Sequence, residues 1–229
     1  LISTGGKLIQ NAKENNFEYI QFENNKIQPR EAIGYSVSLL LLLLNKLSLL
    51  NDTIVSELDD CHTVLQKYRD RLLENESANS AIDFAQQLYN SYPIIYSSST
   101  IESLAFRFRC QLAENSKILS SHFAFPEQNH NEIEGFLSSE TDAFVIVWID
   151  NFIDNDQITK RFNITQSILK NSCKKQILLS DYISLNHKSK LISTILSVYF
   201  LDWVSYYLAI LNNIDPSEIP NIKKIKSNL

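Results

Sequence analysis

The sequence predicts an α/β fold with parallel strands, and two stretches carry that prediction. Residues 1–22 combine the exit of a strand, a hydroxyl-bearing turn at Ser3–Gly6, a helical stretch and a short strand, FEYIQF. Strands that alternate with helices in this way are typical of parallel sheets. Residues 143–149, AFVIVWI, form a nearly unbroken apolar run, as expected of a strand that helices cover on both faces.

A loop and a helix follow the first strands. Pro29 disfavours a helical conformation at Gln28, so we expect a loop there and a helix from about residue 31 to residue 50. The run Leu39–Leu44 is apolar all round, which predicts that this helix is buried on most faces.

The next stretch, residues 53–73, has apolar residues at helical spacing on one face. Cys61 falls in that stripe, so we expect a packed thiol, whereas the neighbouring His62 is expected in solvent. The polar segment Glu74–Ser80 is the candidate junction between two subdomains, residues 1–75 and residues 76–229.

The second subdomain is expected to begin with a helix capped by Ser80, followed by a strand, YPIIY, at 92–96. The hydroxyl run Ser97–Thr100 then precedes another helix. Such a run can cradle a phosphate at a helix N-terminus. It can also simply cap the helix through Ser99 or Thr100, and capping is the favoured interpretation.

The rest of the chain predicts a helix near 156–169, a strand near 176–180 and a long helix over 187–212. The long helix is apolar on more than one face, which suits burial between subdomains or in a dimer interface. It could also cross a bilayer by length, but Asp202 in its middle favours a soluble protein. The lysines near the end, Lys223, Lys224 and Lys226, are typical of a solubilising tail.

Composition narrows the function. The 229 residues are 44% hydrophobic, enough for a proper core, and the net charge of −5 argues against a nucleic-acid or anionic-membrane partner. Three separated cysteines favour a reducing compartment, and we expect a cytoplasmic protein. No metal-ligand spacing is visible in the sequence, and no metal or organic cofactor is expected.

The stretch 105–135 concentrates ionisable residues. Glu114 lies near arginines on an expected helix, and His130 follows in a polar turn. A carboxylate with an imidazole nearby is suited to moving protons. The alternative is a solvated helix face followed by a loop, and charge alone favours that alternative.

This stretch resembles a known family. ENSK at 114–117 and PEQNHNEIEG at 126–135 are similar to signatures of the bifunctional phosphoglucose/phosphomannose isomerases, in the sugar-isomerase (SIS) superfamily. QPREAIGY, DWVSYYLA and DPSEIPNIKKIKSNL match in order at 28–35, 202–209 and 215–229. The departures are small, for example Ser116 where the family usually has Ala.

The resemblance implies a three-layer αβα SIS architecture with a five-stranded parallel sheet in each subdomain. The second subdomain would be complete and the first partial. The chain has no methionine and starts at LISTGG. We therefore expect an N-terminally incomplete sequence, with the family's phosphate-binding loop, of the type S-G-x-T, encoded ahead of Leu1.

The implied reaction interconverts glucose 6-phosphate or mannose 6-phosphate with fructose 6-phosphate through an enediol. Glu114 would be the base, and His130, from the neighbouring subunit of a homodimer, would open the sugar ring with help from Lys226. Arg30 would stabilise the enediolate. The substrate-binding residues would be Arg30, Ser3 and Thr4.

Two other functions stay open from the sequence. One is a non-catalytic SIS module that binds a sugar phosphate as a sensor, although such a module has no use for both Glu114 and His130. The other is a structural role in which 191–211 is an adhesive surface.

Overall fold

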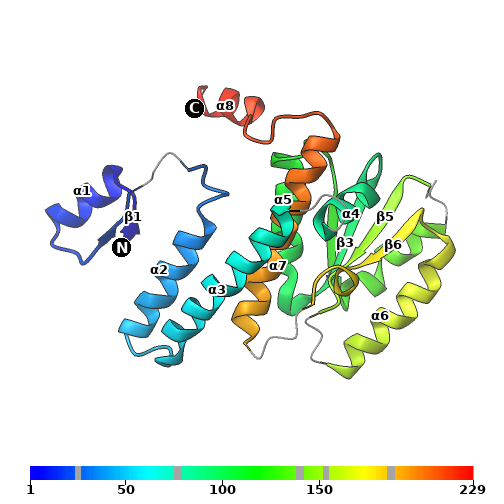
Figure 1. The fold of residues 1–229 in the computed structure, drawn as a ribbon, viewed down its shortest axis with the longest axis horizontal. Coiled ribbons are helices and arrows are strands. Elements are labelled where there is room, and N and C mark those ends of the chain that lie inside the picture. Colours follow the sequence, from blue (N-terminus) through cyan, green and yellow to red (C-terminus); the bar gives the residue numbers. More distant parts are fainter. Residues whose placement is uncertain (24–26, 75–78, 138–141, 152–154, 185–188, 229) are drawn as a thin grey trace. The chain divides into compact units, whose positions relative to one another are not determined.

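A computed structural model describes residues 1–23, 27–74, 79–137, 142–151, 155–184 and 189–228. The chain divides into two compact units, Leu1–Asp59 and Asp60–Leu229. Each unit is described by itself, with its elements labelled in Figure 1. The predicted subdomain boundary, between residues 75 and 76, lies outside the described residues and stays a prediction.

The first unit contains a small parallel pairing. Strand β1 (Ile2–Ser3) pairs with β2 (Ile20–Gln21), and helix α1 (Gly6–Glu14) connects them. Ile9 and Ala12 are the buried residues of α1. Parallel strands joined by a helix were predicted here and are confirmed, although β2 is shorter than the run FEYIQF suggested.

Helix α2 (Ile33–Lys46) contains the leucine run, and the expectation that it is buried on most faces is wrong. None of its residues is buried, and Leu40 is half exposed. Within the unit Leu1–Asp59, α2 is accompanied by one nine-residue helix, two strands of two residues each and the first seven residues of the helix Thr53–Glu74. These elements offer too little apolar surface to cover a helix that is apolar all round.

Helix α3 (Thr53–Glu74) links the two units in sequence and matches its prediction closely. Cys61 is buried in its apolar stripe, and burial raises the pKa of that thiol. His62 is exposed, as expected. The apolar stripe of α3 therefore packs as the helical spacing predicted.

The second unit is built on a sheet of four described strands in the order β4-β3-β5-β6, all parallel. The sequence resemblance predicted five. Its elements along the chain are α4 (Ser80–Leu88), β3 (Tyr92–Ser98), α5 (Glu102–Glu114), β4 (Ser121–Phe125), β5 (Phe144–Trp148), α6 (Asp156–Ile168), β6 (Lys175–Leu178), α7 (Lys190–Leu211) and α8 (Pro220–Lys226).

Helices cover both faces of this sheet (Figure 1). On one face Ile95 and Val147 pack against α4, α5 and α7, and on the other face Tyr96 and Trp148 pack against Phe162 of α6. Successive residues of β3 and β5 thus enter opposite cores, which requires both strands to be apolar throughout. The three-layer α/β prediction is confirmed for this unit.

Two capping predictions are wrong. Asn79, and not Ser80, caps α4, because its Oδ1 accepts from the backbone N–H groups of Ala81 and Ile82 at 3.0 and 3.3 Å. Neither Ser99 nor Thr100 caps α5; Thr100 instead shares a 2.8 Å hydrogen bond with the hydroxyl of Ser98.

Two elements were not predicted. Strand β4 is an edge strand of five residues, too short for a clear alternation, and α8 occupies the segment expected to be a tail.

Helix α7 is long and apolar enough to cross a membrane by length and composition. It packs against α4 and α5 with Leu196, Phe200 and Val204 in the core, which is typical of a core helix. The predicted start of this helix at His187 lies outside the described residues.

Candidate functional site

Glu114 is the last residue of α5, at the head of the ENSK turn, which comprises residues 114–117. Three residues after the end of the helix, Lys117 adopts a left-handed backbone conformation, φ 58°, and its Nζ donates to the carbonyl oxygen of Glu114. The last turn of α5 has no basic residue. A carboxylate is unfavourable beside the negative end of a helix dipole, so helix stability does not explain Glu114.

The ENSK turn is fixed to helix α7. Asn115 Nδ2 donates to Ser205 Oγ at 2.9 Å, and the buried Ser116 Oγ donates to the carbonyl oxygen of Ser205 at 2.6 Å. Ser116 is a position where the sequence departs from the Ala that is usual in the family it resembles. The hydrogen bond to Ser205 gives that departure a structural reason.

One turn of α7 earlier, Asp202 binds the same helix α5. Arg107 Nη2 lies 2.6 Å from Asp202 Oδ2, and Gln111 Nε2 donates to Asp202 Oδ1 at 3.0 Å. Burial raises the pKa of Asp202, while Arg107 lowers it. The DWVSYYLA motif therefore supplies, through Asp202 and Ser205, the surface that holds α5 and its terminal Glu114.

His130 belongs to a second polar turn, the NHNE turn, made of the 3-10 segments η3 (Glu127–His130) and η4 (Glu132–Leu137). Its imidazole is exposed. Directly before it, Asn129 Nδ2 donates to Thr165 Oγ1 of α6 at 2.8 Å, and Arg161 Nη1 donates to Asn129 Oδ1 at 3.4 Å. Like the ENSK turn, the NHNE turn is therefore held by side-chain hydrogen bonds next to an accessible ionisable group.

Glu132, two residues after His130, provides the second anchor of the NHNE turn. Tyr96 Oη on strand β3 donates to Glu132 Oε2 at 2.8 Å. Burial raises the pKa of Glu132 to about 7, against the lowering effect of the hydrogen bond from Tyr96. Sequence reasoning did not select Glu132, although its place in the NHNE motif was a signal.

Within one chain, Glu114 and His130 lie at opposite ends of the sheet. Helix α5 connects the parallel strands β3 and β4, so it runs antiparallel to them. The start of α5 contacts β4, where Glu102 Oε1 lies 3.7 Å from His122 Nε2. Glu114 therefore lies beyond the amino ends of the strands, whereas His130 follows the carboxyl end of β4. Helix and strand rises place them on the order of 20 Å apart.

The other predicted site residues divide between the units. Arg30 is half-buried in the turn before α2. Ser3 Oγ exchanges hydrogen bonds with the backbone of Gly5 at 3.1 and 3.3 Å, and the exposed Thr4 accepts through its carbonyl oxygen from Gln21. Lys226, exposed, ends α8 in the second unit.

The path to Lys226 begins beside Glu114. Asn212, which follows α7, donates through Nδ2 to the carbonyl oxygen of Ser116 at 3.4 Å. The chain therefore leaves α7 next to the ENSK turn and forms α8 eight residues later. The segment that leads to Lys226 therefore starts at the Glu114 end of the unit.

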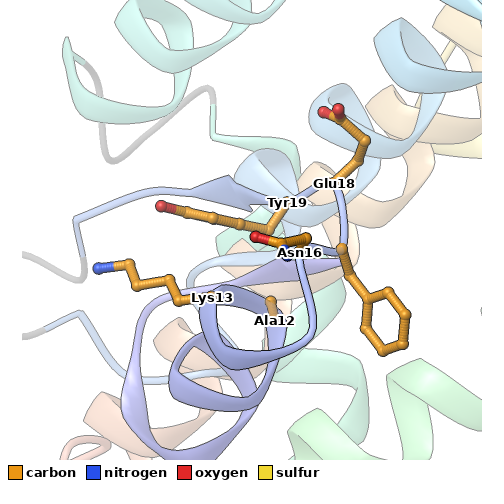
Figure 2. A pocket seen from close by; sticks show the side chains of 6 residues that line it. Ala12, Lys13, Asn16, Glu18 and Tyr19 are labelled. Carbon is orange, nitrogen blue, oxygen red and sulfur yellow. The ribbon is translucent and has the colours of Figure 1, made fainter.

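The first unit has a hollow of about 380 Å³ at the end of α1 (Figure 2). It is lined by Ala12, Lys13, Asn16, Phe17, Glu18 and Tyr19, and Lys13 Nζ lies 5.8 Å from the centre of the Tyr19 ring. Ser3 and Thr4 precede the opposite, N-terminal end of α1. The hollow is therefore not the predicted substrate contact. Among the residues that the structure describes, no three His, Cys, Asp or Glu could hold a metal ion.

The two turns fall within a region that matches a known family. Residues 77–229 match the family described as the bacterial phospho-glucose isomerase C-terminal SIS domain. The chain belongs to this family. The match includes the whole described sheet of the second unit and both anchored turns.

Relatives of this SIS family extend the similarity over the whole chain. The chain is 34% identical over 233 aligned residues to the bifunctional phosphoglucose/phosphomannose isomerase of Caldicellulosiruptor bescii, covering 100% of the chain and 67% of that protein. Identity to the Aquifex aeolicus protein of the same name is 29%, over 100% of the chain and 66% of the relative. The chain thus spans about two thirds of the length of the curated relatives it matches.

A solved structure shows the same SIS fold at lower identity. Glucosamine-6-phosphate deaminase from Thermotoga maritima aligns with a TM-score of 0.62 and 12% identity, over 96% of this chain and 63% of that chain. At this identity the likeness concerns the fold alone.

Proposed function

We propose that this protein is a sugar-phosphate aldose–ketose isomerase that interconverts glucose 6-phosphate or mannose 6-phosphate with fructose 6-phosphate. Relatives that cover the whole chain carry the name bifunctional phosphoglucose/phosphomannose isomerase. The observation that supports it best is the pair of anchored turns, which present Glu114 and His130 on rigid supports. Catalytic groups need such support, because small misplacements cost large factors in rate.

The chemistry needs a proton moved between C1 and C2 of the open sugar. In the proposed reaction the Glu114 carboxylate removes the proton from C2 of the aldose, giving an enediolate with its negative charge on O1. The proton of the C2 hydroxyl passes to O1 through the enediol, and Glu114 returns its proton to C1 as the C2 carbonyl of the ketose forms. His130 gives and takes the protons that open and close the ring, assisted by Lys226. Side chains complete this proton balance, so the proposed reaction needs no cofactor.

Because Glu114 and His130 of one chain lie at opposite ends of the sheet, the proposed site takes them from two chains. A homodimer with two-fold symmetry forms two such sites, since each copy lends its His130 to the partner's Glu114. The separation of these residues within the second unit supports this arrangement over a site built from one chain.

The remaining roles follow the substrate's charge. Arg30 is proposed to stabilise the enediolate. Ser3, Thr4 and Arg30 are proposed to contact the sugar phosphate. Ser3 and Thr4 lie in a turn that opens α1, where backbone N–H groups favour anions. We place the protein in the cytoplasm, in the interconversion of hexose phosphates shared by glycolysis and gluconeogenesis.

An activity assay on the full-length protein tests the proposal. We expect fructose 6-phosphate to form from both glucose 6-phosphate and mannose 6-phosphate, in the presence of a chelator. Saturable binding of either sugar phosphate without turnover would favour the sensor alternative. Neither binding nor turnover, with self-association retained, would favour the structural alternative.

A further inference from the structure

The geometry points to Tyr96 and Glu132 as a positioning pair for His130: their hydrogen bond fixes the turn that carries the imidazole. This inference rests on the proposed function, in which His130 handles the ring-opening proton. It assigns a task to two residues that do not themselves touch the reacting atoms.

Tyr96 is a rigid donor. Its side chain is fully buried on β3, with the ring centroid 5.0 Å from Trp148, 5.9 Å from Phe125 and 6.3 Å from Phe123. Aromatic packing on several sides leaves the ring one orientation. The phenolic hydroxyl is therefore held at a defined point under the NHNE turn, where it meets Glu132 Oε2 at 2.8 Å.

The bond to Glu132 completes a hold on both sides of His130. Asn129 precedes the histidine and is tied to Thr165 of α6 at 2.8 Å. Glu132 follows it by two residues and is tied to β3. Its backbone N–H also donates to Asn131 Oδ1 at 2.6 Å. The short segment between these anchors can move little, while the His130 side chain itself stays exposed.

The surroundings of Glu132 bear on whether the bond or the charge does the positioning. Tyr96 on β3 hydrogen-bonds to Glu132, and Cys173, ahead of β6, lies close enough to influence Tyr96. Burial disfavours the ionised carboxylate. The Glu132 oxygen accepts from Tyr96 whether the carboxyl group is charged or neutral, so a neutral amide oxygen at this position can replace it.

Three variants of the full-length enzyme separate the bond from the charge. Tyr96→Phe removes the donor and Glu132→Ala removes the acceptor, so we expect kcat to fall about tenfold in each with KM within about twofold. Glu132→Gln keeps an acceptor, and we expect it to retain most of kcat. If Glu132→Gln loses as much activity as Glu132→Ala, the carboxylate charge acts directly and the positioning role is overturned.

Two neighbours serve as matched controls. Tyr92 is on the same strand and face as Tyr96, with its ring packed on Phe144, and Glu134 is an exposed acid of the same turn. We expect Tyr92→Phe and Glu134→Gln to keep parental kcat. A similar loss in either control would show that general damage to this region, and not the bond, lowers the rate.

Amide hydrogen exchange over residues 127–134 provides a readout that does not depend on isomerase activity. We expect faster exchange in Tyr96→Phe and Glu132→Ala, and parental exchange in Glu132→Gln and both controls. Unchanged exchange in Tyr96→Phe and Glu132→Ala overturns the positioning pair even in an active isomerase. If the parent proves inactive while exchange responds as expected, the proposed function fails and the pair still holds the turn.

Discussion

Glu114 and His130 of one chain lie at opposite ends of the same parallel sheet. The first ends α5 beyond the amino ends of the strands, and the second follows β4 at their carboxyl ends. Each is carried by a turn fixed to the body of its unit, the ENSK turn to α7 and the NHNE turn to α6 and β3. The candidate base Glu114 and the candidate acid His130 are thus each carried by a fixed turn, but within one chain they lie far apart.

Replacing the proposed base should remove catalysis. We expect Glu114→Gln in the full-length protein to lower kcat by about 10²–10⁴-fold, because the amide cannot accept the C2 proton. Glu102→Gln, at the exposed start of the same helix, is the control and should stay close to the parent. Steady-state isomerisation of glucose 6-phosphate measures both. A Glu114→Gln variant with near-parental kcat would refute the assignment.

Mixing two inactive variants should restore activity if the site is shared. When Glu114→Gln and His130→Gln chains exchange subunits at equal amounts, half of the dimers are mixed, and one of the two sites in each mixed dimer has both groups intact. We therefore expect about one quarter of parental activity. The measurement is activity before and after subunit exchange in dilute denaturant.

Each variant mixed only with itself is the control for this complementation. Activity that stays at the level of the single variants after verified subunit exchange would mean that Glu114 and His130 do not form one site across a two-fold interface.

Removing the acid that holds α5 to α7 should destabilise the second unit. Asp202→Ala takes away the acceptor of Arg107 and Gln111, and we expect the free energy of unfolding to fall by about 2–3 kcal/mol. The exposed ion pair between Lys223 and Glu218, at 2.9 Å, is the control. Lys223→Ala should change the free energy of unfolding by less than about 0.5 kcal/mol. Urea unfolding measures both; equal effects would contradict the special role of Asp202.

Ser116→Ala restores the residue that the family usually has, yet it should cost stability here. The buried carbonyl oxygen of Ser205 loses the donor at 2.6 Å, and we expect a loss of about 1 kcal/mol. Ser227→Ala removes a similar hydroxyl bond at an exposed site and should be close to neutral. Urea unfolding of the two variants decides whether the Ser116 bond contributes; a neutral Ser116→Ala would show that it does not.

Stability should depend on pH through Glu132. Burial raises the pKa of this carboxyl group to about 7, so between its ordinary range and pH 7 the folded chain holds a proton that the unfolded chain releases. The free energy of unfolding therefore falls as the pH rises through this window and levels off above it. Solvent at this partly exposed side chain moderates the slope.

Glu132→Gln cannot ionise, so this part of the pH dependence should disappear. Urea unfolding at about pH 5 and about pH 8 measures the difference, with Glu134→Gln as the exposed control that keeps the parental slope. An identical pH dependence in the parent and in Glu132→Gln would show that Glu132 does not titrate in this range.

Local pattern was enough for much of this chain. Helical spacing over residues 53–73, the apolar run at 143–149 and the motifs ENSK and NHNE identified the α/β fold and its family, because periodicity and motif are properties of neighbouring residues. The same information failed for β4, whose five edge residues carry too weak a pattern, and for α2, whose burial depends on which surfaces cover it.

Only the tertiary structure decided what distant residues do to one another. Tyr96 and Glu132 are 36 residues apart in sequence, and Ser116 and Ser205 are 89 apart, yet each of these hydrogen bonds fixes a turn, and burial of Glu132 raises the pKa of its carboxyl group. The placement of Glu114 and His130 at opposite ends of the sheet likewise follows from the antiparallel course of α5. Burial and hydrogen bonding across such separations are set by packing, which no local stretch of sequence contains.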